Sequence, residues 1–137
     1  MKIVLCRGVF DLLHVAHLRH LEEAKTFGDR LVVSLTTDEA AEREKRRPII
    51  PEKERMEMLR GLRCVFDVSL CSDPLRDLQQ WKPQIFCKGY DCIANGLPLA
   101  VTDYCAEHGI EIVYTSPNPQ TTSGIIKRIR CLTLPSA

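Results

Sequence analysis

The sequence predicts a single α/β domain built on a parallel sheet. Short apolar runs alternate with stretches of helical apolar spacing along all 137 residues, and glycines or prolines stand at several junctions. Strands that alternate with helices become parallel neighbours through right-handed crossovers, which cover both faces of the sheet with helices. The length suits one domain with its own core, and no linker, repeat or low-complexity segment divides it. We therefore expect one domain over residues 1–137, with residues 132–137 as a frayed tail.

Five apolar runs are predicted as strands. The first contains Ile3-Val4-Leu5-Cys6 with no polar residue, which is typical of a strand buried on both faces. Pro83 separates the fourth strand from the helix before it. The predicted strands are Lys2–Cys6, Arg30–Leu35, Val65–Leu70, Gln84–Lys88 and Glu111–Thr115.

Five stretches have the apolar spacing of helices. Gly28-Asp29 is predicted to stop the first helix and Gly109 the fourth, because glycine commonly stands just beyond a helix end. Pro51 suits the first turn of the second helix. The predicted helices are Leu13–Phe27, Glu52–Leu62, Leu75–Trp81, Leu97–His108 and Thr122–Cys131.

Residues 42–47 form a charged run, for which we expect a solvated helix end or a mobile loop. Lys45, Arg46 and Arg47 differ from Arg43 because they follow the predicted end of the second strand. Ligands of open α/β sheets bind beyond the carboxyl ends of the strands. This basic loop is therefore placed to close over phosphates, whereas Arg43 is predicted to face solvent.

Composition excludes some classes of partner. The formal net charge of +1 argues against broad electrostatic binding to nucleic acid or to an anionic membrane. No apolar run approaches the roughly 20 residues that span a bilayer. The seven cysteines are scattered without a C-x-x-C pair, and Cys6, Cys71 and Cys87 fall in or beside strands as small apolar fillers. We expect a reduced, cytoplasmic protein.

The segment from Arg7 to His17 is the most informative part of the chain. Gly8 follows the first strand and can take a positive φ or let a ligand approach the backbone closely. The helix after it offers free N–H groups and the positive end of its dipole to an anion. His14 and His17, three residues apart, can point at the same anion. These features predict a nucleotide site that holds phosphates.

Two other interpretations stay open at this point. Either histidine alone is typical of a capping or packing residue. A zinc site formed by His14, His17 and His20 with a cysteine is the second alternative, although zinc-binding pairs on helices usually stand four residues apart.

The decamer from Gly8 to His17, G-V-F-D-L-L-H-V-A-H, resembles the G-x-F-D-x-x-H-x-G-H signature of the nucleotidylyltransferases with the cytidylyltransferase-like fold. The likeness continues through residues 21–25, 28–33, 37–39, 47–52, 88–91 and 121–126, and so covers nearly the whole chain. Ala16 stands where the signature has glycine, which narrows the space for a nucleotide against the helix. The resemblance implies a single Rossmann-like domain with a five-stranded parallel sheet of order 3-2-1-4-5.

The same resemblance implies an enzyme that moves a nucleoside monophosphate from a nucleoside triphosphate to a phosphorylated small-molecule acceptor and releases pyrophosphate. Residues 47–49 and 88–91 look like those of heptose-1-phosphate adenylyltransferases, which favours ATP and a sugar or polyol phosphate. Glycerol-3-phosphate cytidylyltransferases are similar, but their Arg-Thr-x-Gly-Ile-Ser stretch is missing from residues 116–121. FMN adenylyltransferases, a catalytically silent nucleotide-binding module and a thiol-redox or flavodoxin-like carrier are the alternatives.

The resemblance also implies roles for single residues. His14 and His17 are implied as hydrogen-bond donors to the α- and β-phosphates, and Lys88 and Arg55 as cations for phosphate. Asp11 is expected to orient the helix start, as an N-cap for example, or to hold Mg²⁺ or another divalent cation, with Asp38 as a spare ligand. The binding residues implied are Gly8, Val9, Phe10, Asp11, Asp38, Lys45, Gly89, Asp91, Thr121, Thr122 and Ser123. A homodimer is compatible with the resemblance, and neither nucleic acid nor a membrane is expected as a partner.

Overall fold

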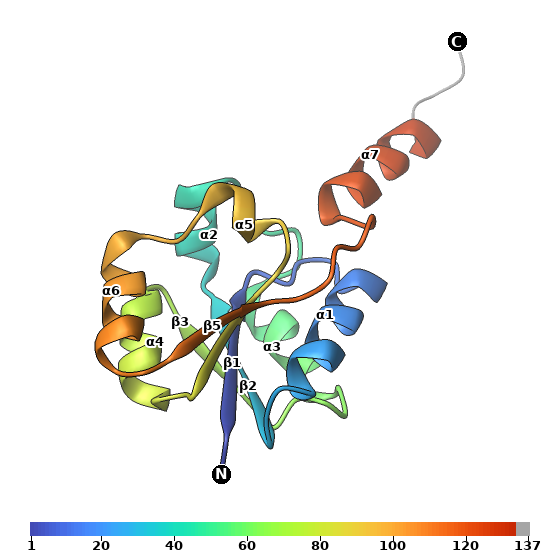
Figure 1. Ribbon diagram of the computed structural model, residues 1–137. Coiled ribbons are helices and arrows are strands. Elements are labelled where there is room, and N and C mark those ends of the chain that lie inside the picture. Colours follow the sequence, from blue (N-terminus) through green and yellow to red (C-terminus); the bar gives the residue numbers. More distant parts are fainter. Residues whose placement is uncertain (134–137) are drawn as a thin grey trace.

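The computed structural model describes residues 1–133 and contains a five-stranded, all-parallel sheet (Figure 1). The strand order is β3-β2-β1-β4-β5, so the predicted α/β class and order 3-2-1-4-5 are confirmed. β1 lies at the centre, where Cys6 pairs with Val33 of β2 on one side and with Cys87 of β4 on the other. The strands are β1 (Ile3–Gly8), β2 (Arg30–Thr36), β3 (Asp67–Cys71), β4 (Ile85–Lys88) and β5 (Glu111–Tyr114).

The five predicted helices are present. They are α1 (Val15–Lys25), α3 (Glu52–Arg60), α4 (Pro74–Trp81), α6 (Leu99–Glu107) and α7 (Thr122–Thr133). α7 extends to Thr133, and residues 134–137 lie outside the described residues, so the frayed tail expected over residues 132–137 stays a prediction.

Two further helices were not predicted. α2 (Asp38–Glu44) begins inside the segment before the charged run, where Thr37 caps it by accepting a hydrogen bond from the Ala40 N–H group. Ala40 and Ala41 are the buried residues of α2. α5 (Cys92–Asn95) is a single turn. Both helices lie beyond the carboxyl edge of the sheet (Figure 1).

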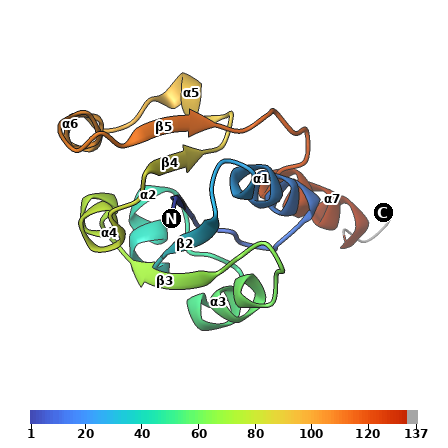
Figure 2. The ribbon, with the colours of Figure 1, turned by 60° about the horizontal axis from the view of Figure 1, so that its bottom comes forward.

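The core has two layers, one on each face of the sheet (Figure 2). Leu21 of α1 and Leu59 of α3 pack with Val4 and Cys6 on one face. The other face is covered by α4 and α6, whose contributions include Leu78 and Val101 against Leu5, Val32 and Phe86. Alternate residues of β1 therefore face opposite layers, which confirms that this strand is buried on both sides.

Four of the seven cysteines are buried and behave as apolar fillers. All seven are free, and Cys6, Cys71 and Cys87 are buried as expected, as is Cys105. No helix within residues 1–133 has the length and apolar character to cross a membrane.

Two glycines beyond helix ends have different roles. Gly109 has φ of +65° and follows α6 in the left-handed conformation that glycine favours, as predicted. Gly28 does not stop α1, because the helix already ends at Thr26, whose backbone is right-handed. Gly28 is instead needed for close packing, since a Cβ there would lie 2.7 Å from Cγ2 of Val4 and 2.8 Å from the carbonyl oxygen of Lys2.

We expect Gly28→Ala to lower the free energy of unfolding by about 1–3 kcal/mol, because the added methyl overpacks against backbone. Gly61→Ala is the matched control. Gly61 has an ordinary φ of −78°, and its added Cβ would come no nearer than 3.4 Å to another atom. It should therefore be neutral or stabilising by about 0.4–1 kcal/mol. Urea unfolding of both variants checks this, and equal stabilities would contradict the packing argument.

Candidate active site

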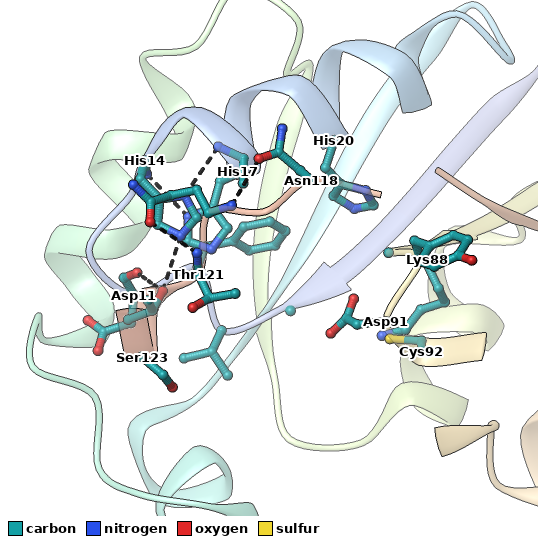
Figure 3. A pocket seen from close by; sticks show the side chains of 18 of the residues that line it. Asp11, His14, His17, His20, Lys88, Asp91, Cys92, Asn118, Thr121 and Ser123 are labelled. Atoms are coloured by element: carbon teal, nitrogen blue, oxygen red, sulfur yellow. Dashed lines mark hydrogen bonds between the residues drawn. The ribbon is translucent and has the colours of Figure 1, made fainter. Parts of the chain in front are cut away.

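A cavity of about 630 Å³ lies at the carboxyl edge of the sheet, where β1 meets β4. Its walls come from the β1–α1 loop, the first turns of α1, the end of α2, the β4–α5 connection and the segment from β5 to α7. Figure 3 shows two groups of side chains in it. His14, His17, Asn118, Thr121 and Ser123 form the first group with Asp11, and Lys88, Asp91 and Cys92 form the second.

The β1–α1 loop turns sharply through two residues with left-handed backbone. Phe10 and Leu12 both have φ of 51°, which is uncommon for residues with a side chain and is found mostly where the surrounding structure enforces it. Of the two roles left open for Gly8, the positive φ does not occur. Gly8 instead lies under the Phe10 ring, where a Cβ would come within 3.0 Å of Cε2.

Asp11 holds this loop in place. Its carboxylate accepts hydrogen bonds from the Ile49 and Ile50 N–H groups, each at 2.9 Å, and from Nη1 of Arg46 at 3.0 Å. Burial opposes ionisation of Asp11, but the two backbone donors and Arg46 outweigh it and lower the pKa of the carboxyl. Asp11 is therefore not the N-cap of α1, and three of the roughly four acceptor positions of its carboxylate are occupied within the protein. Its role as a ligand of a divalent cation stays a prediction.

His14 and His17 form a reciprocal cap at the start of α1. Nδ1 of His14 accepts from the Ala16 N–H group at 3.2 Å, and Nδ1 of His17 accepts from the His14 N–H group at 3.3 Å. Their rings stack with centroids 3.8 Å apart. A neutral imidazole whose Nδ1 accepts must carry its proton on Nε2. The capping role and the predicted donor role thus belong to different nitrogens of the same rings.

The Nε2 atom of His14 lies 3.3 Å from the hydroxyl oxygen of Thr122. That hydroxyl donates to the carbonyl oxygen of Asp11 at 2.9 Å, so its oxygen accepts from the imidazole. Thr122 begins α7 and therefore ties the last helix to the first.

Burial keeps these rings neutral. It lowers the pKa of His14. The pKa of His17 falls to about 4, through burial first and then the charges of His14 and His20. Burial and then Lys88 lower the pKa of His20, also to about 4. At neutral pH the cavity is therefore lined by uncharged donors, and its positive charge comes from other side chains.

Those charges come from β4 and from the basic loop. Nζ of Lys88 donates to the carbonyl oxygen of Arg7 at 3.2 Å, which places this lysine beside β1. Lys45 and Arg46 also line the cavity, and Nζ of Lys45 reaches the Ser123 hydroxyl at 3.4 Å. Arg47 does not line the cavity and pairs with Glu42 and Asp38.

The roles predicted for Arg55 and Asp38 need correction, because neither residue lines the cavity. Arg55 is only 2% exposed and donates to the carbonyl oxygens of Val9, Thr36 and Ile50 and to the Asp38 carboxylate, 2.6 Å away. This arginine is a buried brace that ties α3 to the β1–α1 loop, the end of β2 and the segment before α3, so it does not fit the role of a phosphate ligand. The Asp38 carboxylate accepts hydrogen bonds from Arg55 and from the Glu52 N–H group.

The cavity brings together the other predicted residues and several that sequence reasoning did not assign. The predicted ones are Gly8, Val9, Phe10, Asp11, His14, His17, Lys45, Lys88, Gly89, Asp91, Thr121, Thr122 and Ser123. The unassigned ones include Arg7, His20, Tyr90, Cys92, Thr115, Asn118 and Gln120. The position of His20, three residues after His17, was a usable signal, and its Nδ1 lies 2.7 Å from the Thr115 hydroxyl.

The zinc alternative does not hold for the described part of the chain. Residues 1–133 contain no group of three or more His, Cys, Asp or Glu side chains placed to hold a metal ion.

Comparison with known proteins gives consistent results. Residues 5–124 match the family model described as cytidylyltransferase-like. The chain is 37% identical over 134 residues to the bifunctional protein HldE of Geobacter metallireducens and 43% identical over 94 residues to that of Helicobacter pylori strain P12. These matches cover 93% and 66% of this chain but 27% and 20% of the relatives, so the chain spans about a quarter of their length.

A solved structure is also similar over its whole length. The lipopolysaccharide core biosynthesis protein from Thermoplasma volcanium is 32% identical, with a TM-score of 0.77. The match covers 86% of this chain and 98% of that protein.

We expect Arg55→Met to lower the free energy of unfolding by about 3–5 kcal/mol, because it strands Asp38 and three carbonyl groups. Arg43→Met is the control. The Arg43 side chain is 64% exposed, and its removal should change stability by less than about 0.5 kcal/mol. Urea unfolding measures both. An Arg55→Met protein of unchanged stability would contradict the bracing role.

The histidines should also make the fold sensitive to acid. Their neutral forms are favoured by folding, so the stability they contribute is complete above their ordinary pKa of 6.5 and is lost as pH falls toward about 4. Urea unfolding at pH 7.5, 5.5 and 4.5 should show this loss, and His17→Asn should reduce it. An identical pH dependence in the variant would contradict the assignment to His17.

Proposed function

The chain belongs to the cytidylyltransferase-like family of nucleotidyltransferases, and we propose that it transfers a nucleoside monophosphate from a nucleoside triphosphate, ATP in preference, to a sugar or polyol phosphate. Pyrophosphate is the second product. The observation that carries this proposal is the pair of neutral imidazoles at the start of α1, each with Nδ1 fixed by a backbone N–H group and the proton therefore on Nε2, which in His14 is bonded to Thr122. Relatives named HldE and a lipopolysaccharide core biosynthesis protein support a sugar phosphate as the acceptor.

Attack of an acceptor phosphate oxygen on the α-phosphorus needs no covalent enzyme intermediate. The residues have to position the reactants and to stabilise the charge that builds on the phosphate oxygens. His14 and His17 donate from Nε2 to oxygens of the α- and β-phosphates. Because both rings are neutral and already oriented by α1, no proton has to move and little reorganisation is needed when the transition state forms.

Charged side chains complete the phosphate site. Lys45 and Ser123 meet above the start of α7, where free N–H groups also favour an anion, so the departing pyrophosphate is best held there. In this arrangement Thr122 releases the His14 Nε2 donor to the nucleotide. Lys88 lies in the second group of side chains and neutralises phosphate from the side of β4.

Magnesium enters the proposal with the triphosphate. Hard cations prefer oxygen ligands and usually retain several waters. Because most acceptor positions of Asp11 are taken by Ile49, Ile50 and Arg46, phosphates and water are the main ligands of magnesium in this proposal, and the roles given to the protein residues do not depend on the ion.

The activity test is pyrophosphate release. ATP, CTP, GTP and UTP are each combined with glycerol 3-phosphate, sugar 1-phosphates and FMN in the presence of Mg²⁺. The proposal predicts turnover that is fastest with ATP and a sugar 1-phosphate. Turnover confined to CTP and glycerol 3-phosphate, or to FMN, would replace the proposed substrates. Nucleotide binding without turnover on any acceptor would favour the silent module, for which Ala16 in the cavity wall is the specific sign.

We expect His17→Asn to lower kcat by about 100- to 1,000-fold, the usual effect of removing one positioned donor. Asparagine keeps an acceptor for the His14 N–H group and removes the Nε2 donor. His108→Asn is the matched control, because His108 is exposed at the end of α6 and outside the cavity. A His17→Asn enzyme with more than a third of wild-type kcat would contradict the donor role.

A further inference from the structure

Arg7 is a charged residue of the cavity wall that the proposed mechanism does not use. It is the last residue but one of β1, it is 9% exposed, and it is one of the residues that line the cavity. Its Nη1 atom alone makes three hydrogen bonds, to the Ser34 hydroxyl at 3.2 Å, the Cys71 carbonyl oxygen at 3.0 Å and the Asp77 carboxylate at 3.1 Å.

The ion pair between Arg7 and Asp77 is incomplete. An arginine commonly meets a carboxylate through two parallel hydrogen bonds. Here Oδ1 of Asp77 is buried without a hydrogen-bond partner, and among residues 1–133 no acceptor is bonded to Nε or Nη2 of Arg7. These two nitrogens are not among the described buried side-chain atoms that lack a partner, so they keep some exposure, and Arg7 is one of the residues that line the cavity. The pair therefore fixes the arginine by one nitrogen and leaves its other N–H groups for a ligand.

The Arg7 side chain also lies on the face of the sheet opposite α1. The side chain before it, Cys6, packs in the layer under α1, whereas Arg7 contacts Asp77 of α4. In an in-line displacement the attacking oxygen and the leaving pyrophosphate lie on opposite sides of the reacting phosphorus. If the start of α1 and of α7 hold the triphosphate, the acceptor has to approach from the other side, toward the face that Arg7 occupies.

We propose that Arg7 binds the phosphate of the acceptor, with Nε and Nη2 as its donors and with Asp77 and Ser34 as the groups that orient it. The inference rests on the proposed function, which it deepens by placing the acceptor. A planar guanidinium with two free donors matches a tetrahedral oxyanion bearing two accessible oxygens. The ligand class is thus a phosphate monoester, whose dianion carries the nucleophilic oxygen. An acceptor with only hydroxyl groups would leave the charge of Arg7 unused.

Calorimetric titration of inorganic phosphate into the full chain, with a non-hydrolysable ATP analogue and Mg²⁺ already saturating, is the test. We expect Arg7→Met to weaken phosphate binding by about 10- to 100-fold, as for the loss of charged hydrogen bonds, and to change affinity for the ATP analogue by less than threefold. His17→Asn should show the reverse pattern. In turnover assays Arg7→Met should raise the acceptor KM and leave the KM for the triphosphate nearly unchanged.

A double variant separates binding from folding. Arg7→Met leaves Asp77 buried without its cation, which alone can destabilise the protein. Arg7→Met with Asp77→Asn removes that unpaired charge. If Arg7 only stabilises the fold, the double variant recovers both stability and phosphate affinity, which would overturn the inference. If Arg7 binds the acceptor, stability recovers and the weak phosphate binding persists.

Two further results would also overturn it. One is phosphate affinity of Arg7→Met within twofold of wild type, and the other is the lack of phosphate binding to the wild-type chain. An absence of turnover with every nucleotide and acceptor would refute the proposed function instead, because the calorimetric comparison does not require turnover.

Discussion

The carboxylate of Asp11 is the constraint on which the rest of the site depends. It lies between two residues with left-handed backbone, Phe10 and Leu12, and accepts hydrogen bonds from Ile49 and Ile50. The loop that it fixes delivers the chain from the central strand to the start of α1 in the one orientation that brings the imidazoles over the sheet edge. Its own carbonyl oxygen receives the Thr122 hydroxyl, so the last helix is positioned from the same point.

The histidine pair uses one arrangement for both folding and function. In each ring Nδ1 accepts a hydrogen bond of the helix cap, which fixes the tautomer and orientation of the ring. Burial keeps both rings uncharged because it lowers their pKa. An uncharged donor is stable next to its neighbour at the 3.8 Å stacking distance, where two imidazolium ions would repel each other. Positive charge is supplied separately by Lys45 and Lys88, on long side chains that can adjust to a phosphate.

The sheet order and most elements could be predicted because the strands are mostly short apolar runs and the family signature is local in sequence. What could not be predicted depends on contacts between distant segments. Arg55 was predicted from the sequence as a cation for phosphate, yet its acceptors come from the end of β2 and from two loops that meet only in the fold. α2 was not predicted because charged residues surround its two buried alanines in the sequence. The residues with left-handed backbone in the sharp turn are Phe10 and Leu12 rather than glycines, so nothing in the local sequence indicated this conformation.

The central claim is that two neutral imidazoles present Nε2 donors to a nucleotide. Long-range ¹H–¹⁵N correlation NMR at pH 7 reads the tautomer and charge of each histidine directly. The account requires His14 and His17 to be neutral with the proton on Nε2, and both signals to shift when ATP and Mg²⁺ are added. Protons on Nδ1, charged rings in the free protein, or signals that ATP leaves unchanged would contradict it.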